Sequence, residues 1–207
     1  MTKCFIFVQM TTKNKSNLKL IELLLNNKIK PASINILMAV GKILVVKKKT
    51  KLIQLGDVCD KGFFILDGGF ISRVYNPQTK KSRTQNFFLD DFNPFMSCED
   101  SYFTGEKTNT DLLAIKDSLV IQFTKNDLER VCTANQDLAN FFNNYIIVNA
   151  LKQESALRKM INAFSKEELY NYLIDNCNPV IKNVPSKYIA EFIGISAEWL
   201  SKTKKKI

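Results

Sequence analysis

The chain has 207 residues, 45% of them hydrophobic, which is enough to bury one large hydrophobic core or two small ones. It contains no histidine, which excludes the commonest general base, the serine and cysteine triads, and histidine-ligated zinc or haem. We therefore expect no enzymatic activity, no catalytic residues and no metal site. The formal net charge of +10 instead favours an anionic binding partner.

The cysteines and the apolar segments indicate the compartment. Five cysteines are scattered along the chain without a CxxC pair, and this odd number favours reduced thiols over a disulfide framework. No apolar run approaches the roughly 18 residues that a membrane span needs. The apolar patch within residues 1–15 lacks a full hydrophobic region and a small-residue cleavage site, so we expect no signal peptide. These features predict a cytoplasmic protein without a membrane partner.

The positive charge is concentrated at the two ends of the sequence. Residues 1–56 hold eleven lysines and one glutamate (+10), residues 57–181 hold thirteen basic and seventeen acidic side chains (−4), and residues 182–207 hold six lysines and two glutamates (+4). A basic end suits a polyanion such as nucleic acid, because lysines that neutralise phosphates release condensed counterions. A proteome that uses lysine as its solubilising residue explains the same charge equally well.

The first half of the chain predicts two short helices and then a β-rich region. Residues 17–27 and 33–40 have helical amphipathic patterns. Asp67-Gly68-Gly69 lies between two apolar runs and favours a hairpin turn, whereas residues 90–111 form a polar, turn-rich loop. Many short strands at close spacing indicate a sandwich or roll. The predicted strands are residues 43–46, 52–55, 63–66, 70–75, 85–89, 112–115 and 119–123.

A long helix follows the β-rich region. Thr124 and Asp127 resemble a capping box at the start of a short helix that ends at Val131. Residues 135–159 contain no proline or glycine and predict one helix. Two adjacent apolar stripes favour burial on both sides, against the β domain and against a partner helix. The alternative is that both stripes face one intramolecular core. The stripes comprise Leu138, Phe141, Tyr145 and Val148, and Phe142, Ile146, Ala150 and Leu157.

The C-terminal segment carries the most informative motif. A further helix is expected to begin at Ser165, where Glu168 completes a capping box. Ser186 can then cap a helix over residues 187–193, Gly194 ends it, and Ser196 can cap a second helix. Two short helices separated by a three-residue turn predict a DNA-binding helix-turn-helix. A plain helical hairpin is the main alternative, and RNA or protein binding are minor ones.

The expected DNA contacts follow from the way recognition helices place their N-terminal residues in the major groove. Glu198 can accept a hydrogen bond from a cytosine amino group, and Lys202 can donate one to guanine or phosphate. Lys187 is a candidate for a phosphate contact at the start of the first helix. The full predicted DNA-binding set is Lys187, Ser196, Ala197, Glu198, Ser201, Lys202 and Lys205.

The β-rich region, the long helix and the segment VPSKYIAEFIGISAEWLSK at residues 184–202 together resemble the Crp/Fnr family of transcription regulators. The similarity is greatest to the short-tailed regulators common in Bacteroidetes. It implies an α+β fold with an N-terminal antiparallel β-roll of the cyclic-nucleotide-binding jelly-roll type at residues 1–132. A dimerisation helix at residues 133–160 and an all-α, winged-helix-like helix-turn-helix domain at residues 161–207, without a following wing, complete this arrangement.

The resemblance implies a homodimer that binds double-stranded DNA at a near-palindromic operator, with RNA polymerase as a further candidate partner. The residues expected at the dimer interface are Leu138, Phe141, Phe142, Tyr145 and Val148. Two other functions remain open: a cyclic-nucleotide-responsive regulator of conventional type, and a protein-interaction scaffold with a degenerate helix-turn-helix.

The sequence departs from the family pattern at the sensor site. Members that bind cyclic nucleotides carry a Gly-Glu pair and, about ten residues later, Arg-Ser or Arg-Thr. Here Thr108-Asn109 occupies the place of the arginine pair, and Gly105-Glu106 comes too late in the loop. We therefore expect weak or no cAMP binding, no cofactor and an unknown effector, with Thr108 and Asn109 as the candidate ligand-binding residues. Only Cys4 lies near the N-terminus, which argues against an iron–sulfur sensor.

Overall fold

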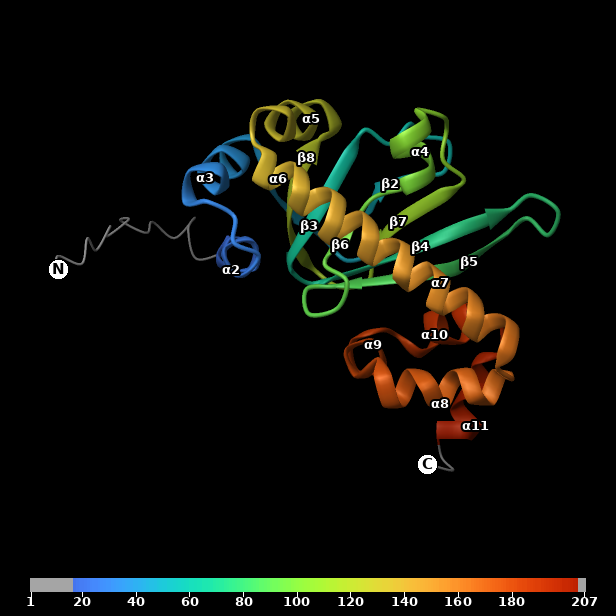
Figure 1. The fold of residues 1–207 in the computed structure, drawn as a ribbon. Helices are drawn as coiled ribbons and strands as arrows, with labels where there is room; N and C mark the ends of the chain where they lie inside the picture. Colours follow the sequence, from blue (N-terminus) through green and yellow to red (C-terminus); the bar gives the residue numbers. More distant parts are fainter. Residues whose placement is uncertain (1–16, 205–207) are drawn as a thin grey trace, which may run out of the picture.

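The computed structural model describes residues 17–204, which form a roll of two four-stranded antiparallel sheets with helices before and after it (Figure 1). The sheets have the strand orders β1-β8-β3-β6 and β2-β7-β4-β5. The expected antiparallel β-roll and α+β class are therefore confirmed. The strands are β1 (Lys42–Val46), β2 (Lys51–Ile53), β3 (Lys61–Asp67), β4 (Gly69–Asn76), β5 (Lys81–Leu89), β6 (Phe95–Met96), β7 (Thr110–Ala114) and β8 (Ser118–Thr124).

The second sheet is covered on both faces. Along β4, Phe70 belongs to the core inside the roll, whereas its neighbour Ile71 packs in the core shared with the C-terminal helices. The same division recurs on β5, where Phe88 is in the roll and Phe87 faces the helices. Successive side chains of a strand point to opposite faces. Consecutive buried residues therefore mean that this sheet separates two hydrophobic cores.

The Asp67-Gly68-Gly69 segment carries the chain from one sheet to the other, so the predicted hairpin at this place is wrong. β3 pairs with β6 and β8, whereas β4 pairs with β5 and β7. Gly68 has a φ of +116°, and a Cβ there would lie 2.1 Å from the Ser118 hydroxyl oxygen. The glycine pattern correctly indicated an unusual backbone conformation, but this conformation suits a crossing between sheets as well as a hairpin.

The hairpin of this region is formed by β4 and β5 instead. The Asn76 side-chain oxygen accepts hydrogen bonds from the backbone N–H groups of Gln78 and Thr79 at 2.9 and 3.1 Å. Such side-chain bonds to the backbone stabilise a tight turn. The paired strands project from the roll beyond the other strands (Figure 1).

The expected loop at residues 90–111 contains two short elements that the sequence did not reveal. One is β6, and the other is helix α4 (Glu99–Thr104), which ends at Gly105 with a φ of +75°. Elements of two and six residues are too short for a hydrophobic period to identify them.

Three short helices cover one end of the roll. The predicted helices at residues 17–27 and 33–40 are α2 (Leu18–Asn26) and α3 (Pro31–Val40). Helix α5 (Lys125–Ala134) begins as expected, since the Thr124 hydroxyl accepts the N–H of Asp127 at 3.1 Å. Leu20, Leu24 and Leu37 are buried in a core that includes side chains of β3, β8 and the long helix.

The long helix is continuous from residue 136 to residue 163, but it changes its winding. It comprises α6 (Gln136–Phe141), a π-helical segment η1 (Phe142–Ile147) and α7 (Val148–Ala163). Leu138 and Phe141 are buried in the core of their own chain, and Phe142 and Tyr145 pack against that core. By contrast, Ile147, Val148 and Leu151 are exposed at 38%, 37% and 60%. The apolar side chains of the helix therefore face their own core up to Ile146, are exposed at residues 147, 148 and 151, and become half-buried again at Leu157 and Met160.

Four helices follow the long helix in the described part of the chain. Helix α8 (Lys166–Asn176) has the predicted capping box of Ser165 and Glu168. The short helix α9 (Asn178–Asn183) was not predicted, and α10 (Ser186–Ile193) and α11 (Ala197–Lys204) follow. No helix in the described part of the chain is long and apolar enough to span a membrane.

Candidate nucleic-acid interface

A left-handed turn joins α10 and α11 at the predicted position. Gly194 has a φ of +79°, and the N–H groups of Gly194 and Ile195 both donate to the Ala190 carbonyl, at 2.9 and 3.0 Å. This hydrogen bonding closes the end of α10 in the manner of a glycine C-cap. The Ser196 hydroxyl then accepts the N–H of Trp199 at 3.1 Å, which caps α11 as expected. Helix α10 begins at Ser186 itself, with Pro185 at its cap position.

The two helices are held together by a small apolar core. Ile189, Ala190, Ile193 and Leu200 are each no more than 2% exposed, and Ile195 packs against them. Ala190 lies one turn before Gly194, where a small side chain leaves room for the second helix. This local geometry is that of a helix-turn-helix.

One face of α11 is left open to solvent. Ser196, Glu198, Ser201 and Lys202 are all exposed, and Trp199 is half-buried. The backbone N–H of Glu198 and the Ser196 hydroxyl hold the pKa of the Glu198 carboxyl below its usual value, with a smaller contribution from Lys202. The Glu198 carboxylate is therefore ionised at neutral pH, when it can accept hydrogen bonds but cannot donate them.

Three further residues were predicted to contact DNA: Lys187, Ala197 and Lys205. Lys187 is exposed, and its Nζ lies 4.5 Å from the centroid of the Tyr188 ring. This contact is a cation–π interaction that leaves the ammonium group at the surface. Ala197 is the first residue of α11, although only its backbone is described, and Lys205 lies outside the described residues.

The helix-turn-helix is attached to the roll by an ion pair that the sequence did not suggest. A terminal nitrogen of Arg73 on β4 lies 3.2 Å from a carboxylate oxygen of Glu191 on α10. The Thr84 hydroxyl on β5 donates to the same carboxylate at 2.9 Å. These partners are more than 100 residues apart in sequence, so no local pattern could have paired them. The Glu191 carboxylate, whose side chain is 30% exposed, therefore has two partners on the roll.

Apolar and polar contacts extend this attachment toward the turn. The rings of Phe87 on β5 and Phe192 on α10 lie 5.0 Å apart between centroids. Next to them, Arg83 on β5 donates to the Glu191 carbonyl at 3.3 Å. The only sequence signal for this interface is the run of apolar residues at 87–89, which indicates burial on both faces of a strand.

The candidate ligand-binding residues Thr108 and Asn109 take part in closing their own loop. Thr108 is 3% exposed, and its backbone exchanges hydrogen bonds of 2.8 and 2.9 Å with Asp57 and Gly56. The Thr108 hydroxyl accepts the N–H of Thr110 at 3.0 Å. The Asn109 carbonyl accepts the N–H of Tyr75 at 2.9 Å, although the residue is exposed. The described contacts of both residues thus stabilise the roll.

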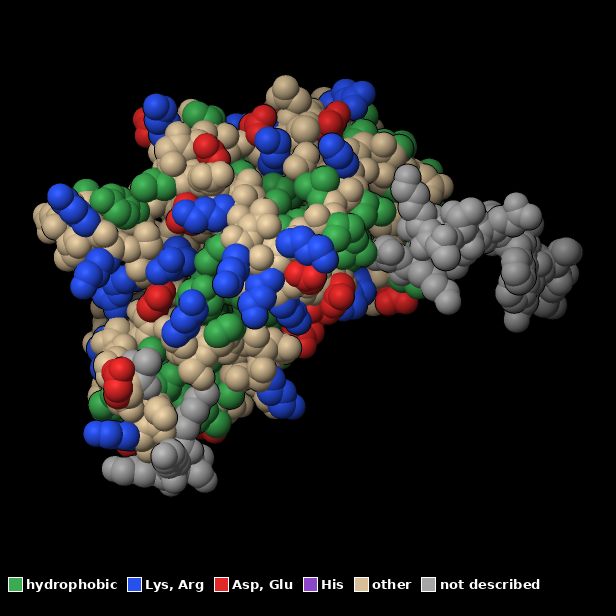
Figure 2. Space-filling view, turned by 180° about the vertical axis from the view of Figure 1, so that it is seen from behind, with side chains coloured by type: hydrophobic (Ala, Val, Ile, Leu, Met, Phe, Trp, Pro, Cys, Tyr) green, Lys and Arg blue, Asp and Glu red, His purple; other side chains and the backbone are tan. Residues whose placement is uncertain are grey.

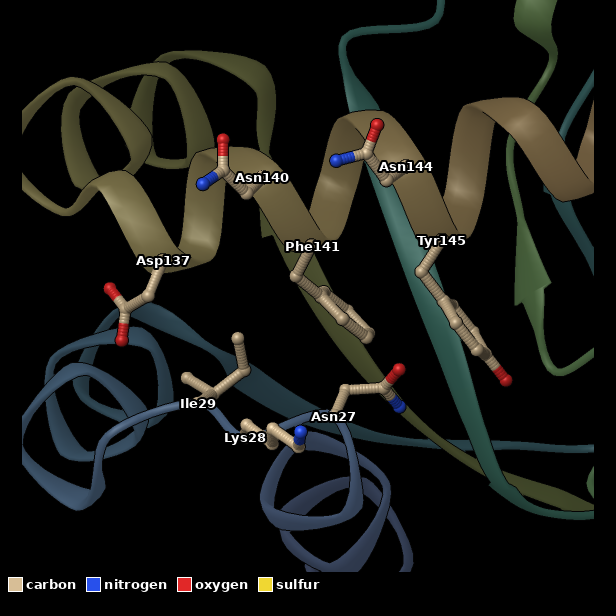
Figure 3. A pocket seen from close by; sticks show the side chains of 8 residues that line it. All are labelled: Asn27, Lys28, Ile29, Asp137, Asn140, Phe141, Asn144 and Tyr145. Atoms are coloured by element: carbon tan, nitrogen blue, oxygen red, sulfur yellow. The ribbon is translucent and has the colours of Figure 1, made fainter.

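A cleft of about 380 Å³ opens at the other end of the long helix, between the α2–α3 turn and the α6–η1 part of that helix (Figure 3). Asp137 accepts hydrogen bonds there from the Lys30 N–H and the Ser33 hydroxyl, at 3.1 and 2.9 Å, and so ties the start of α3 to the long helix. The cleft is remote from the helix-turn-helix, and it contains neither Thr108 nor Asn109. Its lining residues are Asn27, Lys28, Ile29, Asp137, Asn140, Phe141, Asn144 and Tyr145.

The fold is similar to solved structures of transcription regulators. FixK2 from Bradyrhizobium japonicum is 12% identical, with a TM-score of 0.67 over 81% of this chain and 84% of its own. The c-di-GMP-responsive regulator CLP from Xanthomonas campestris is 10% identical, with a TM-score of 0.61 over 86% of this chain and 91% of its own. A crp/fnr family regulator from Eubacterium rectale is 14% identical, with a TM-score of 0.62 over 88% and 85% of the two chains.

No sequence-family profile and no curated protein matches the chain. The structural likeness, at these low identities, establishes the fold. The chain has the fold of Crp/Fnr regulators.

Proposed function

We propose that the protein is a non-enzymatic, cytoplasmic transcription regulator that binds double-stranded DNA through α11 as a homodimer. The observation that carries this proposal is the turn at Gly194, because it presents the exposed residues Ser196, Glu198, Ser201 and Lys202 on one open helix face. A recognition helix reads bases with residues of its N-terminal turns. The fold shared with known regulators supports the same conclusion. RNA polymerase is a further proposed partner.

The homodimer is proposed on the exposed apolar residues of the long helix. Ile147, Val148 and Leu151 lie close together at the end of η1 and the start of α7, between Ile146 and Met160, which pack against the cores of their own chain. Grouped apolar side chains on a helix favour association with a second helix. Two recognition helices then reach two half-sites about one DNA turn, roughly 34 Å, apart.

The experiment that tests this function is capture of DNA fragments from the protein's own genome at physiological salt, followed by sequencing. We expect a recurring inverted repeat with half-sites about one turn apart. If the protein retains DNA fragments that share no sequence motif, its basic surface binds DNA only electrostatically. No retention would favour a protein-interaction scaffold.

We expect Glu198→Ala to change base preference at one position in each half-site. Removal of the carboxylate acceptor costs about 1–3 kcal/mol of discrimination at the base it contacts. The measurement is binding to a library of operator variants. Ser201→Ala serves as the control, since a hydroxyl that only positions the helix leaves the preferred sequence unchanged. If Glu198→Ala also leaves that sequence unchanged, the proposed orientation of α11 in the groove is wrong.

We expect isothermal titration with cAMP to give no binding in the micromolar range. Residues 94–110 contain no arginine, and the described contacts of Thr108 are to the roll itself. A buried cyclic phosphate without a guanidinium partner is poorly compensated for its lost hydration. A dissociation constant of micromolar order or tighter would show that another group in the roll replaces the missing arginine.

A further inference from the structure

Two positively charged side chains from different parts of the fold meet at the turn of the helix-turn-helix. A Cβ placed on Gly194 would lie 2.5 Å from a terminal nitrogen of Arg83 and 3.5 Å from Nζ of Lys166. These two nitrogens are therefore at most 6.0 Å apart. Arg83 comes from β5 of the roll, and Lys166 is the first residue of α8. Both residues are exposed.

The carboxylates near these two cations in the described part of the chain, including Glu167 and Glu168 in the first turn of α8, form no ion pair with them. Neither Arg83 nor Lys166 forms an ion pair among the described residues. The nearby carboxylate of Glu191 is held by Arg73 and Thr84, and Arg83 contacts only the carbonyl of that residue. Glu168, beside Lys166, accepts the N–H of Ser165 in the capping box. Two like charges this close without an ion-pair partner favour binding of an anion.

The position of the pair favours a phosphate of the DNA backbone as the anion. Gly194 is two residues before Ser196, the cap of α11, and two residues of chain reach at most about 7 Å. The pair therefore lies beside the first turn of the proposed recognition helix, where a helix bound in the major groove would bring it close to the DNA backbone. Lysine and arginine side chains also gather on the rear face of the molecule above the C-terminal helices, which favours approach of a polyanion (Figure 2).

We propose that Arg83 and Lys166 form an anion clamp that binds one backbone phosphate of the operator, so that the sensor roll itself contacts DNA. This inference rests on the proposed DNA-binding function. An arginine supplies forked donors for phosphate oxygens, and the lysine adds a point charge from the other side. The clamp contributes affinity without base preference, since a phosphate contact carries no direct sequence information.

The test compares the salt dependence of operator binding for the full-length protein and its Arg83→Gln/Lys166→Gln variant, on a fragment captured from the genome. The double variant of the proposed homodimer loses one phosphate contact in each protomer. This loss lowers the slope of log K against log salt by about 1.8, which is about a sixtyfold loss of affinity at 0.1 M salt. The preferred sequence is expected to stay the same. Arg83→Lys is expected to retain most of the slope because it keeps the charge.

Arg130→Gln is the matched control, because this exposed arginine lies on α5 at the end of the roll away from the helix-turn-helix (Figure 1). It is expected to leave the slope unchanged. Thermal unfolding of each variant separates loss of a contact from loss of the fold. An unchanged slope in the double variant overturns the clamp and indicates that the two cations only stabilise the C-terminal end of α10.

A second experiment, titration with inorganic phosphate, tests whether the clamp binds a phosphate of DNA or a soluble phosphate ion. If the double variant keeps the wild-type DNA slope but loses binding of inorganic phosphate in a calorimetric titration, the clamp serves a soluble phosphate and the DNA assignment is wrong. Failure of the wild-type protein to retain any DNA refutes the proposed function instead. The two failures are thus distinguishable.

Discussion

Gly68→Ala is expected to destabilise the protein more than any other single methyl addition at a described glycine. The backbone there has a φ of +116°, and a Cβ would lie 2.1, 2.4 and 2.7 Å from the Oγ, Cβ and Cα atoms of Ser118. Strain at a glycine-only conformation costs about 1–3 kcal/mol, and overpacking against a backbone atom costs about 1–3 kcal/mol more. The sum is a large part of the 5–15 kcal/mol that stabilises a typical domain.

Urea unfolding followed by circular dichroism measures this loss, and Gly56→Ala is the matched control. Gly56 also has a positive φ, of +90°, but a Cβ there would meet nothing within 4 Å. The control therefore carries the backbone strain without the steric overlap, and we expect it to lose about 1–3 kcal/mol. Equal losses in the two variants would mean that Ser118 moves aside at no cost, and that the crossing between the sheets is less tightly packed than described.

Features that depend on neighbouring residues were predictable from the sequence. Thr124 caps α5, Ser165 and Glu168 form a capping box, and Gly194 with Ser196 makes the turn between α10 and α11. Each of these pairs lies within three residues, so the side chain and the backbone group that it contacts are brought together by local geometry alone. The helix-turn-helix was identifiable for this reason.

Features that depend on which elements meet in space were not predictable. The glycines at 68 and 69 indicated a turn but not the sheet that the chain enters next. The periodicity of the long helix indicated that Leu138 and Phe141 are buried, but not that their partners are in the same chain. The contact of Glu191 with Arg73 joins residues 118 positions apart. Apolar periodicity indicates that one face of a helix or strand is buried, but it does not identify the element that packs against that face.

The candidate site shows the same division between local and distant contacts. The exposed residues of α11 could be proposed from the motif, because their place on the helix follows from its cap. Arg83 and Lys166 could not, since they reach the turn from β5 and α8 only after the roll and the C-terminal helices have packed together. A basic residue in a hairpin is ordinarily a solvated surface residue, and only its neighbours in space give it a function.

Val148→Asp is expected to convert the protein into a monomer and to weaken operator binding strongly. Val148 is exposed between Ile147 and the more exposed Leu151, so an aspartate there is tolerated by the isolated chain. In the proposed dimer the carboxylate would be buried against a second apolar helix, where an unpaired charge is highly unfavourable. A monomer reaches only one half-site. Specific binding exceeds non-specific binding by about 4–10 kcal/mol, so loss of half of it weakens the operator complex roughly 30-fold or more.

Analytical ultracentrifugation and operator titration measure the two effects, and Val45→Asp is the matched control. Val45 on β1 is 74% exposed and lies outside the long helix, so the same substitution there adds a charge without touching the proposed dimer surface. We expect this control to remain dimeric with unchanged operator affinity. A dimeric Val148→Asp variant would place the association surface elsewhere, whereas a monomeric wild type that still reads an inverted repeat would mean that the dimer assembles on DNA.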